Sequence, residues 1–296
     1  MTTFPTPARN VQTQPFLKWA GGKRQLLRQI QRYLPSRFHT YYEPFVGGGA
    51  VLFGLQPGQA VINDVNPELI NTYKVIRNHL EELLADLSKH ENTRDYFYAL
   101  RELDRKPGFQ QLSSVERASR LIYLNKTCYN GLFRVNRNGF FNVPFGAYKK
   151  PNIVNEPVLR SVHDYLSHHP IEILNTDFAK AAASAKEGDF VYLDPPYDPV
   201  SETSSFTGYS LAGFSRHEQT RLRETVDDLT NRGCLVMLSN SATEFIRELY
   251  KDYEIILVEA SRAINSNPDK RGKIDEVLIL NYKPPVSRLR VGTTTC

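Results

Sequence analysis

The 296-residue sequence predicts an α/β protein built on a mostly parallel β-sheet flanked by helices. Short runs rich in β-branched and aromatic residues alternate with stretches of helical periodicity, as in sheets whose strands are joined by helices. The length suits about two domains. Apolar content of 41% and charged content of 23% are ordinary for a globular protein and exclude collagen, wholesale disorder and a disulfide scaffold.

The elements are predicted in order along the chain. Strands are predicted over 41–45, 60–63, 171–175, 190–193, 235–239, 255–258 and 277–282. Helices are predicted over 22–33, 67–78, 216–232 and 242–250, and another is expected to open after the glycines at 47–49. Pro67 suits the first turn of a helix, and Gly233 suits a helix stop.

About ninety residues, from 79 to 168, separate the second and third predicted strands. They carry helical pattern over 95–105 and 113–126, and they are too many for a crossover loop. We therefore expect an inserted second domain. The predicted division is a flexible arm at 1–15, a main domain at 16–78 and 169–283, an inserted domain at 79–168 and a tail at 284–296.

The net charge and the cysteine content indicate which partners and which cellular compartment suit the protein. The net charge of +5 permits a polyanionic partner without requiring one. Cys128, Cys234 and Cys296 form no metal-binding spacing and suit a reducing cytoplasm. No apolar run approaches the ~20 residues that span a bilayer, and no apolar segment follows the start as in a signal peptide. A cytoplasmic protein without a membrane segment is expected.

Asp194, Pro195, Pro196 and Tyr197 follow the predicted buried strand at 190–193. The acid is thus expected at the carboxyl end of a strand, where open α/β sheets bind ligands. The prolines stiffen the turn and remove two donors, which leaves carboxylate and carbonyl acceptors beside an aromatic face. Such an array suits a planar group that bears an amino group. A plain strand-ending turn is an equally good interpretation of these four residues alone.

Glycines and an acid follow the first two predicted strands. Gly47, Gly48 and Gly49 would let a ligand approach the backbone, although their spacing is neither the dinucleotide fingerprint nor a P-loop. Asp64 can accept bonds from ribose hydroxyls or cap the helix that begins at Pro67, and on its own the cap is favoured.

The segment 16–23 holds the only tryptophan, Trp19, and two lysines around a glycine pair. The amides of Gly21 and Gly22 can face a carboxylate at a helix start. A loop in which Trp19 plugs the core is the favoured interpretation of this segment alone.

Residues 126–151 contain five basic residues, six aromatics and no acid. Asn138–Gly139 is a strong hairpin turn signal. A basic hairpin with aromatics can enter a groove of nucleic acid, contact phosphates and wedge into the base stack. The alternative is a solvated loop whose aromatics pack beneath it, but the absence of any acid favours nucleic acid.

Together these segments resemble the bacterial DNA adenine-N6 methyltransferases of the Dam type, most closely the Dpn-type enzymes that methylate GATC. The likeness covers about residues 16–282. It depends on four segments that occur in the same order as in that family: the motif at 18–23, the motif at 44–49, the insert and the motif at 194–197. The stretches 201–207 and 271–273 resemble the Dpn-type branch in particular, and 201–206 is expected to form a polar lip over the site. The resemblance implies a Rossmann-like methyltransferase sheet that binds S-adenosylmethionine (SAM), with the insert as a helical and β-hairpin target-recognition domain.

The resemblance also implies residue roles. Asp64 would bind the ribose of SAM, and Asp177 and Phe178 its adenine. The whole cofactor-binding set would be Trp19, Ala20, Gly21, Lys23, Glu43, Pro44, Phe45, Gly47, Gly49, Asp64, Asp177, Phe178 and Asp194. The catalytic set that holds the target adenine would be Asp194, Pro195, Pro196 and Tyr197. The DNA-binding set would be Lys18, Tyr129, Asn130, Gly131, Leu132, Arg134, Asn138, Pro144, Lys149 and Lys150. Ala147 stands where the family often has arginine, so it is undecided whether this chain makes the DNA-backbone or flanking-base contact expected of that arginine.

The implied reaction moves a methyl group from SAM, without a metal, to N6 of an adenine flipped out of double-stranded GATC. Cytosine-C5 methylation is disfavoured because no cysteine follows a proline, and other amino-methylases more often carry Ser or Asn where Asp194 stands. An inactive DNA-binding regulator and an amino-methyltransferase with another target stay open. Two biological roles also stay open: the protein could act beside a restriction endonuclease without forming a stable complex with it, or it could act alone. A monomer or weak dimer is expected.

Overall fold

The computed structural model describes residues 13–19, 21–23, 26–200, 214–261 and 273–284. Ala20, the expected lip at 201–206, Arg271 and most of the expected arm and tail lie outside the described residues. Within the described part, no helix combines the length and the apolar character needed to cross a membrane.

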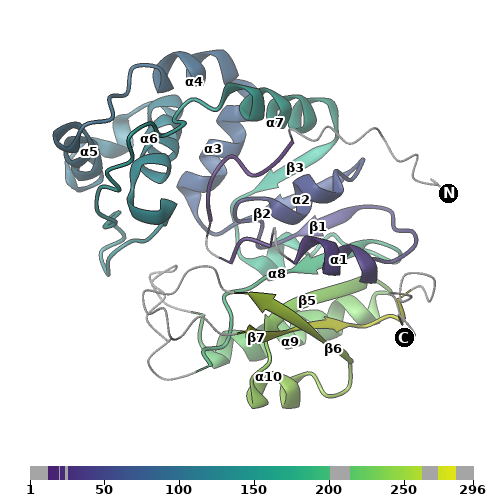
Figure 1. Ribbon diagram of the computed structural model, residues 1–296. Coiled ribbons are helices and arrows are strands. Elements are labelled where there is room, and N and C mark those ends of the chain that lie inside the picture. The colour runs from purple at the N-terminus through teal and green to yellow at the C-terminus, as the bar shows by residue number, and fades with distance from the viewer. Residues whose placement is uncertain (1–12, 20, 24–25, 201–213, 262–272, 285–296) are drawn as a thin grey trace, which may run out of the picture.

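A seven-stranded sheet with the order β3-β2-β1-β4-β5-β7-β6 forms the centre of the molecule (Figure 1). The first five strands of this order are parallel, and β7 runs antiparallel between β5 and β6. This is a Rossmann-like sheet, and it confirms the predicted α/β class. Its strands are β1 (Tyr41–Glu43), β2 (Ala60–Asn63), β3 (Ile171–Leu174), β4 (Phe190–Leu193), β5 (Leu235–Ser241), β6 (Glu254–Ser261) and β7 (Lys273–Leu280).

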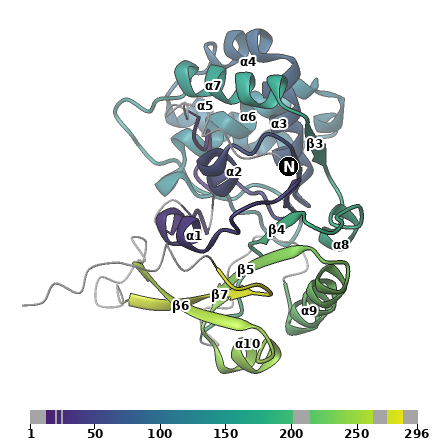
Figure 2. The same ribbon diagram turned by 90° about the vertical axis from the view of Figure 1, so that its right-hand side faces the viewer.

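Helices cover both faces of the sheet, with α1 and α2 on one side and α8 and α9 on the other (Figure 2). The helices are α1 (Leu27–Tyr33), α2 (Ala50–Leu55), α3 (Pro67–Asn78), α4 (Leu80–Leu87), α5 (Arg94–Arg101), α6 (Ser114–Thr127), α7 (Glu156–His168), α8 (Phe178–Ala181), α9 (Arg216–Asn231) and α10 (Glu244–Leu249). Short 3-10 turns lie at Glu102–Arg105, Phe109–Gln111 and Tyr129–Gly131.

Alternate residues of the strands feed two hydrophobic cores. Tyr41 and Tyr192 belong to the core beneath α2 and α3, whereas their neighbours Tyr42 and Val191 belong to the core beneath α8 and α9. Successive side chains of a strand point to opposite faces, so strands with two covered faces are apolar at every position. This explains why the predicted strand at 190–193 is a continuous apolar run.

Several predicted boundaries are wrong. The first helix begins at Leu27 rather than at 22, because Gly21 has a left-handed backbone (φ +69°) and the chain turns at 21–23. Helices α4, α7 and α8 were not predicted as separate elements. Helix α7 did carry a signal, since Val158, Leu159, Val162, Tyr165 and Leu166 recur at helical spacing and are buried.

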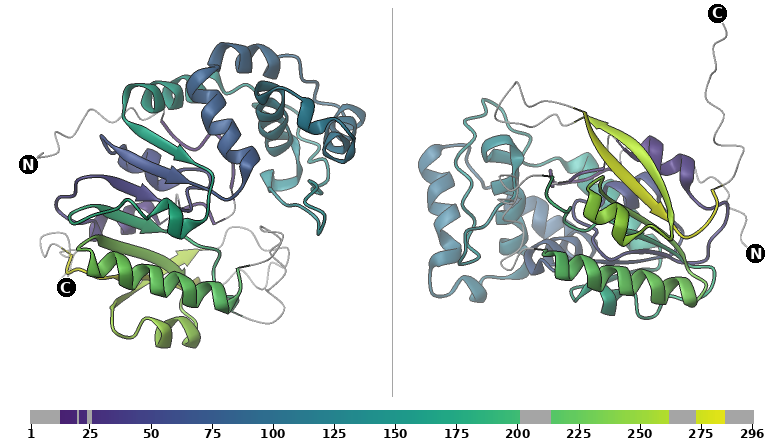
Figure 3. Two further views of the ribbon diagram at one scale, coloured as in Figure 1. Left: turned by 180° about the vertical axis from the view of Figure 1, so that it is seen from behind. Right: turned by 90° about the horizontal axis from the view of Figure 1, so that it is seen from below.

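The inserted segment gathers α4, α5 and α6 at one side of the sheet, beyond α3 (Figures 1 and 3). Its helices do not form a core of their own. Leu121 and Tyr123 of α6 belong to the same hydrophobic cluster as Ile62 of β2 and Tyr73 of α3. Removal of the insert would therefore expose apolar surface on α3. The domain boundaries at 79 and 168 stay a prediction.

The expected hairpin lies at 135–141, where Val135 and Phe141 form an antiparallel bridge. Its turn spans three residues. The Asn136 amide donates to the Phe140 carbonyl, the Gly139 amide donates to the Asn136 carbonyl, and Gly139 has φ +80°. A three-residue hairpin loop that ends on a left-handed glycine is a common alternative to the two-residue turn. Glycine was thus the informative half of the Asn138–Gly139 signal.

Candidate active site and nucleic-acid surface

The site lies where the strand order of the sheet reverses, between β1 and β4. Tyr42 of β1 pairs with Val191 of β4, so the segments that follow Glu43 and Leu193 emerge side by side at one edge. Ligands of open α/β sheets bind at such a switch point, outside the carboxyl ends of the strands. The structure therefore brings the glycine-rich segment and the Asp194–Tyr197 segment together.

The Asp194 carboxylate pairs with the Lys23 ammonium, with 2.7 Å between Oδ1 and Nζ. Lys23 also donates to the Gly21 carbonyl at 2.7 Å and lies 4.7 Å from the ring centre of Tyr197. The Lys23 side chain is 5% exposed and that of Asp194 17%, so this ion pair is largely shielded from water. Burial raises the pKa of Asp194 to about 6, and Lys23 limits that rise by stabilising the carboxylate.

The turn that carries Tyr197 is held by buried polar side chains. Gln219 of α9 donates to the Pro196 carbonyl at 2.9 Å, and Asn240 of β5 donates to Gln219 at 3.1 Å. The Asp198 amide in turn donates to Asn240 at 3.1 Å. The Gln219 and Asn240 side chains were not predicted, because each lies in a segment whose own pattern indicates only helix or strand. They fix the backbone on both sides of Tyr197.

Glu43, at the end of β1, is buried and accepts a hydrogen bond from the Tyr41 hydroxyl at 2.8 Å. Burial raises its pKa to about 8, and the negative charge of Asp194 adds to the rise. Burial thus favours the protonated form of Glu43 more strongly than that of Asp194, whose carboxylate is paired with Lys23.

Asp64 binds the backbone of the glycine-rich segment. Its carboxylate accepts from the Gly47 amide at 3.1 Å and from the Asn66 amide at 2.8 Å, and burial raises its pKa to about 6. The helix-cap interpretation of Asp64 is wrong, since the cap of α3 is Asn66, whose side chain accepts from the amides of Glu68 and Leu69. Asp64 instead connects the ends of β1 and β2.

Asn63 is a buried brace that the sequence interpretation missed. Its side chain donates to the Pro44 carbonyl at 2.9 Å and to the Thr176 carbonyl at 3.0 Å, and it accepts from the Thr176 amide at 2.8 Å. It thereby ties together the segments after β1, β2 and β3. An asparagine within an apolar strand was the available signal.

The glycine-rich segment packs against Trp19. A Cβ atom on Gly47 would lie 2.8 Å from the Trp19 ring, and Gly47 has φ +48°. A Cβ on Gly49, where φ is +72°, would lie 2.6 Å from both Phe53 and the Tyr73 hydroxyl. Glycine is needed here for backbone conformation as well as for space. Trp19 is partly buried, and its ring stacks on Phe133 with centroids 4.6 Å apart.

The predicted adenine-binding pair Asp177–Phe178 follows β3. The Phe178 ring stacks on Phe45, with centroids 5.2 Å apart, and the Arg221 guanidinium lies 4.1 Å above it. Asp177 caps α8 and accepts from Arg221 at 2.9 and 2.7 Å, and these bonds hold its pKa below the usual range. Phe45 and Phe178 thus form an aromatic wall beside the glycine-rich segment.

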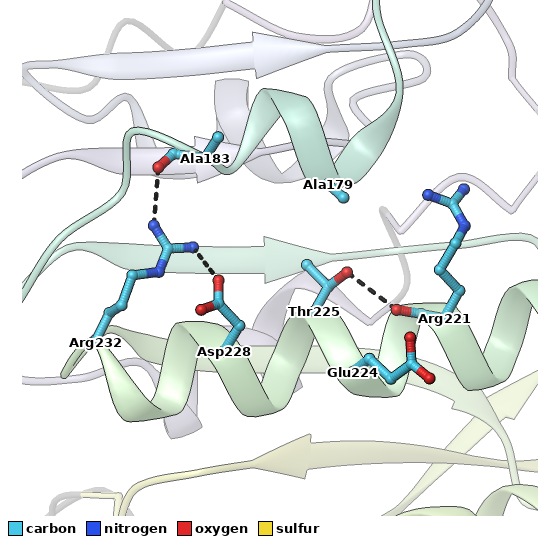
Figure 4. Close-up of a pocket in the computed structure, with 7 residues that line it drawn as sticks. All are labelled: Ala179, Ala183, Arg221, Glu224, Thr225, Asp228 and Arg232. Carbon is cyan, nitrogen blue, oxygen red and sulfur yellow. Dashed lines mark hydrogen bonds and ion pairs between the residues drawn. The ribbon is translucent and has the colours of Figure 1, made fainter.

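A shallow groove between α8 and α9 extends away from this wall (Figure 4). It is lined by Ala179, Ala183, Arg221, Glu224, Thr225, Asp228 and Arg232. Three of its four charged side chains pair within the protein: Arg221 contacts Asp177 at 2.7 Å, and Arg232 contacts Asp228 at 2.9 Å. The groove therefore offers a ligand little uncompensated charge.

Most of the predicted DNA-binding residues are exposed or partly exposed, Gly131 is buried, and the turn at 129–131 lies next to the segment 18–23. The Lys18 amide donates to Asn125 of α6 at 2.9 Å, and Asn125 donates back to the Lys18 carbonyl at 2.8 Å and to the Gly131 carbonyl at 3.0 Å. Asn130 and Gly131 both have left-handed backbones, with φ +57° and +63°. Asn125 was not predicted, and it places Lys18 beside the turn at 129–131.

Exposure divides the aromatics of this surface. Tyr129 is 55% exposed and Tyr148 37%, whereas Phe133 and Phe141 are buried. Four of the six aromatics are thus buried or partly buried beneath the surface, as the solvated-loop alternative expected, and two face outward. The basic residues and the remaining predicted contacts on the outside are Arg134, Asn138, Pro144, Lys149 and Lys150. Leu132 is partly buried, and Ala147 is exposed with φ +52°.

Known proteins are similar to this chain over most of its length. A family model described as D12 class N6 adenine-specific DNA methyltransferase matches residues 19–264. The chain belongs to this family. Its relatives include a type II methyltransferase, M1.LlaDCHI, from Lactococcus lactis subsp. cremoris, with 46% identity over 92% of this chain and 96% of the relative.

Two further relatives show how widely the family is spread. The type II methyltransferase M.MjaIII from Methanocaldococcus jannaschii is 41% identical over 92% of this chain and all of the relative. DNA adenine methylase from Escherichia coli K12 is 36% identical over 92% of this chain and 96% of the relative. This D12-class chain is thus an enzyme that methylates adenine in DNA at N6, and its family and fold imply SAM as the methyl donor.

Lys23 should set the pH range in which this methyltransferase works. Its ammonium lowers the pKa of Asp194, so Lys23→Met should raise that pKa above its present value of about 6. Since the predicted role of Asp194 requires the carboxylate form, the acidic limb of the pH profile should move to higher pH. The profile of kcat/KM for DNA, which reports groups of the enzyme before DNA binds, measures this. An unchanged limb would show that Asp194 is not the titrating group.

Proposed function

We propose that this D12-class enzyme transfers the methyl group of SAM to N6 of an adenine that it flips out of double-stranded GATC. The observation that carries the proposal is the Asp194 carboxylate at the carboxyl end of β4, beside the Tyr197 ring and paired with Lys23. A carboxylate acceptor next to an aromatic face matches an aminopurine. A base inside a duplex cannot reach such a site without leaving its stack.

The residues around the switch point fit SAM. The glycine-rich segment packs closely against Trp19, Phe53 and Tyr73, because Gly47 and Gly49 carry no side chain. Asp64 supplies carboxylate oxygens at the end of β2, where ribose hydroxyls are commonly bound. The aromatic wall of Phe45 and Phe178 suits the adenine of the cofactor, with Asp177 beside it. The proposed cofactor-binding set is completed by Trp19, Ala20, Gly21, Lys23, Glu43, Pro44 and Asp194.

The chain's own groups account for activation of the target. The Asp194 carboxylate and the Pro195 carbonyl would accept the two N–H bonds of the adenine amino group. Such acceptors draw the nitrogen toward tetrahedral geometry and stabilise the positive charge that develops on it. Tyr197 would stack on the ring and hold it in line for transfer. When bound, SAM supplies the electrophilic methyl group. The Lys23 ammonium forms an ion pair with Asp194 in this structure, and the adenine amino group would displace it from the carboxylate.

The surface at 126–151 and Lys18 supply the proposed DNA contacts. Exposed Tyr129, or Asn130 beside it, is placed to fill the gap that a flipped base leaves. Arg134 is proposed to recognise the outer guanine, and Lys149 and Lys150 are proposed to contact phosphates. The insert at 79–168 would then act as the target-recognition domain.

The decisive experiment is digestion of DNA from cells that express the protein. One nuclease should cut only methylated GATC and the other only unmethylated GATC. We expect the DNA to resist the second nuclease and to be cut by the first. DNA from cells that express the matched variant Asp194→Asn should stay unmethylated and show the opposite pattern. Methylation at other adenines would refute GATC as the target but keep the reaction. Binding without methylation would support an inactive regulator.

We propose two alternatives for the biological role of the enzyme: it acts beside a restriction endonuclease, or it acts alone. Two of the relatives named above are called type II methyltransferases, whereas the Escherichia coli relative is called a DNA adenine methylase. A role beside a restriction endonuclease and a solitary role are both compatible with these names.

Substitution of Asp64 tests whether this residue binds the cofactor, and substitution of the nearby cap residue Asn66 controls for a loss of helix capping. Asp64→Ala should weaken binding of the demethylated cofactor by about 1–3 kcal/mol, the usual loss for a buried hydrogen-bonding group. Asn66→Ala is the matched control: loss of the α3 cap should cost about 1 kcal/mol of stability and leave cofactor affinity unchanged. Calorimetry measures the affinities. An unchanged affinity for Asp64→Ala would reduce Asp64 to a brace for Gly47.

A further inference from the structure

Glu276 of β7 accepts a hydrogen bond from the Tyr197 hydroxyl, with 2.9 Å between the oxygens. Tyr197 is thereby held at both ends, since its ring faces Lys23 at 4.7 Å. We propose that Glu276 is a positioning residue for methyl transfer, which holds the Tyr197 ring in the orientation that stacks on the target base beside Asp194. The proposal rests on the proposed function only in taking Tyr197 as the stacking face.

The backbone that carries Glu276 is rigid. In the sheet Glu276 lies opposite Ser241 of β5 on one side and Val258 of β6 on the other, so strands bond to it from both sides. The end of β5 also holds the residue after Tyr197, because the Ser241 hydroxyl donates to the Asp198 carbonyl at 2.6 Å. The hydroxyl of Tyr197 and the backbone beyond it are thus tied to the same pair of strands.

The chemistry of the contact favours a functional role. A phenol that donates to a carboxylate forms a charge-assisted hydrogen bond, which is stronger and more directional than one between neutral groups. Glu276 is a partly buried acid at the end of an otherwise apolar run, since residues 277–280 of the same strand are buried and apolar. Simple sheet stability would be served as well by an apolar residue at this position.

Glu276 also acts on the reacting centre through its charge. Burial has the largest effect on the pKa of Asp194, and the neighbouring groups that also act on its ionisation include Lys23, Glu276, Tyr197 and Glu43. The negative charge of Glu276 raises the pKa of Asp194, in the opposite sense to Lys23. Loss of that charge should therefore leave a mark on the pH profile that a purely structural residue would not leave.

The test compares single-turnover methyl transfer from labelled SAM to plasmid DNA that contains all short sequences. Glu276→Ala should lower the rate constant about tenfold, the least that a hydrogen bond to a charged group is usually worth, with DNA affinity unchanged. Glu276→Gln keeps an acceptor and should restore most of the rate, while its acidic limb moves to lower pH. Glu254→Gln, an exposed acid on β6, is the matched control and should behave as wild type.

A double-mutant cycle shows whether Glu276 acts through the hydroxyl. Tyr197→Phe should lose about as much rate as Glu276→Ala, and the double variant should lose no more than the worse single one. Additive losses, or a Glu276→Ala variant as fast as wild type, would overturn the proposal. If Glu276→Ala fails to fold, an unshifted acidic limb in Glu276→Gln would overturn it. Methylation outside GATC would refute the proposed target alone, since every variant is compared on the DNA that wild type methylates.

Discussion

Asp194→Asn should abolish nearly all methyl transfer and leave DNA binding intact. The substitution replaces one acceptor oxygen by an amide group that donates, so it meets the N–H groups of the adenine and the Lys23 ammonium with the wrong polarity. Loss of one preorganised electrostatic partner usually costs about a hundredfold or more in rate. Single-turnover kinetics with labelled SAM measures the rate, and fluorescence anisotropy of a labelled duplex measures binding.

Two comparisons make this result specific. Asp194→Ala removes the acceptor altogether and should be equally slow, while Asp164→Asn changes an exposed acid on α7 and should match wild type. The Asp194 turn is held through Gln219, Asn240 and Asp198, none of which the substitution touches, so the fold should be unchanged. An Asp194→Asn enzyme within a few-fold of wild type would remove Asp194 from the catalytic set.

Arg134→Ala should relax discrimination at the first base of the proposed GATC site. Arg134 is exposed, and only its Nε is used in its hydrogen bond to Asn142 at 2.8 Å, which leaves the outer fork of the guanidinium for two acceptors of guanine. The variant should lose about 1–3 kcal/mol on GATC and much less on duplexes altered at that base. A panel of duplexes substituted at each position measures the difference.

Lys150→Ala is the matched comparison on the same exposed surface. A phosphate contact carries no sequence information, so this variant should weaken all duplexes nearly equally and lower the salt slope by about one unit. The panel is therefore assayed at two salt concentrations. If Arg134→Ala weakened every duplex equally, Arg134 would be a phosphate contact, and Lys18 or Leu132 would become the candidate for guanine.

Local signals in the sequence were enough to predict the seven strands and to put Asp194 at the end of one of them. The run at 190–193 is buried on both faces, and such strands are apolar at every position, so β4 was predicted with its observed bounds. Helix α3 was also predicted with its observed bounds, because Pro67 marks its first turn. Parallel strands place their carboxyl ends at one edge, which is why the segments after β1 and β4 could be expected together.

The D12-class motifs, by contrast, do not show which distant side chains complete the site. The partners Tyr197 and Glu276 are 79 residues apart, and Glu276 looks from its own segment like an ordinary polar position in a strand. It reaches Tyr197 because β7 enters antiparallel between β5 and β6 in one register. The brace from Asn125 to Lys18 spans 107 residues in the same way. Strand order and register bring such side chains together, and local periodicity carries no information about either, so only the tertiary structure decided these contacts.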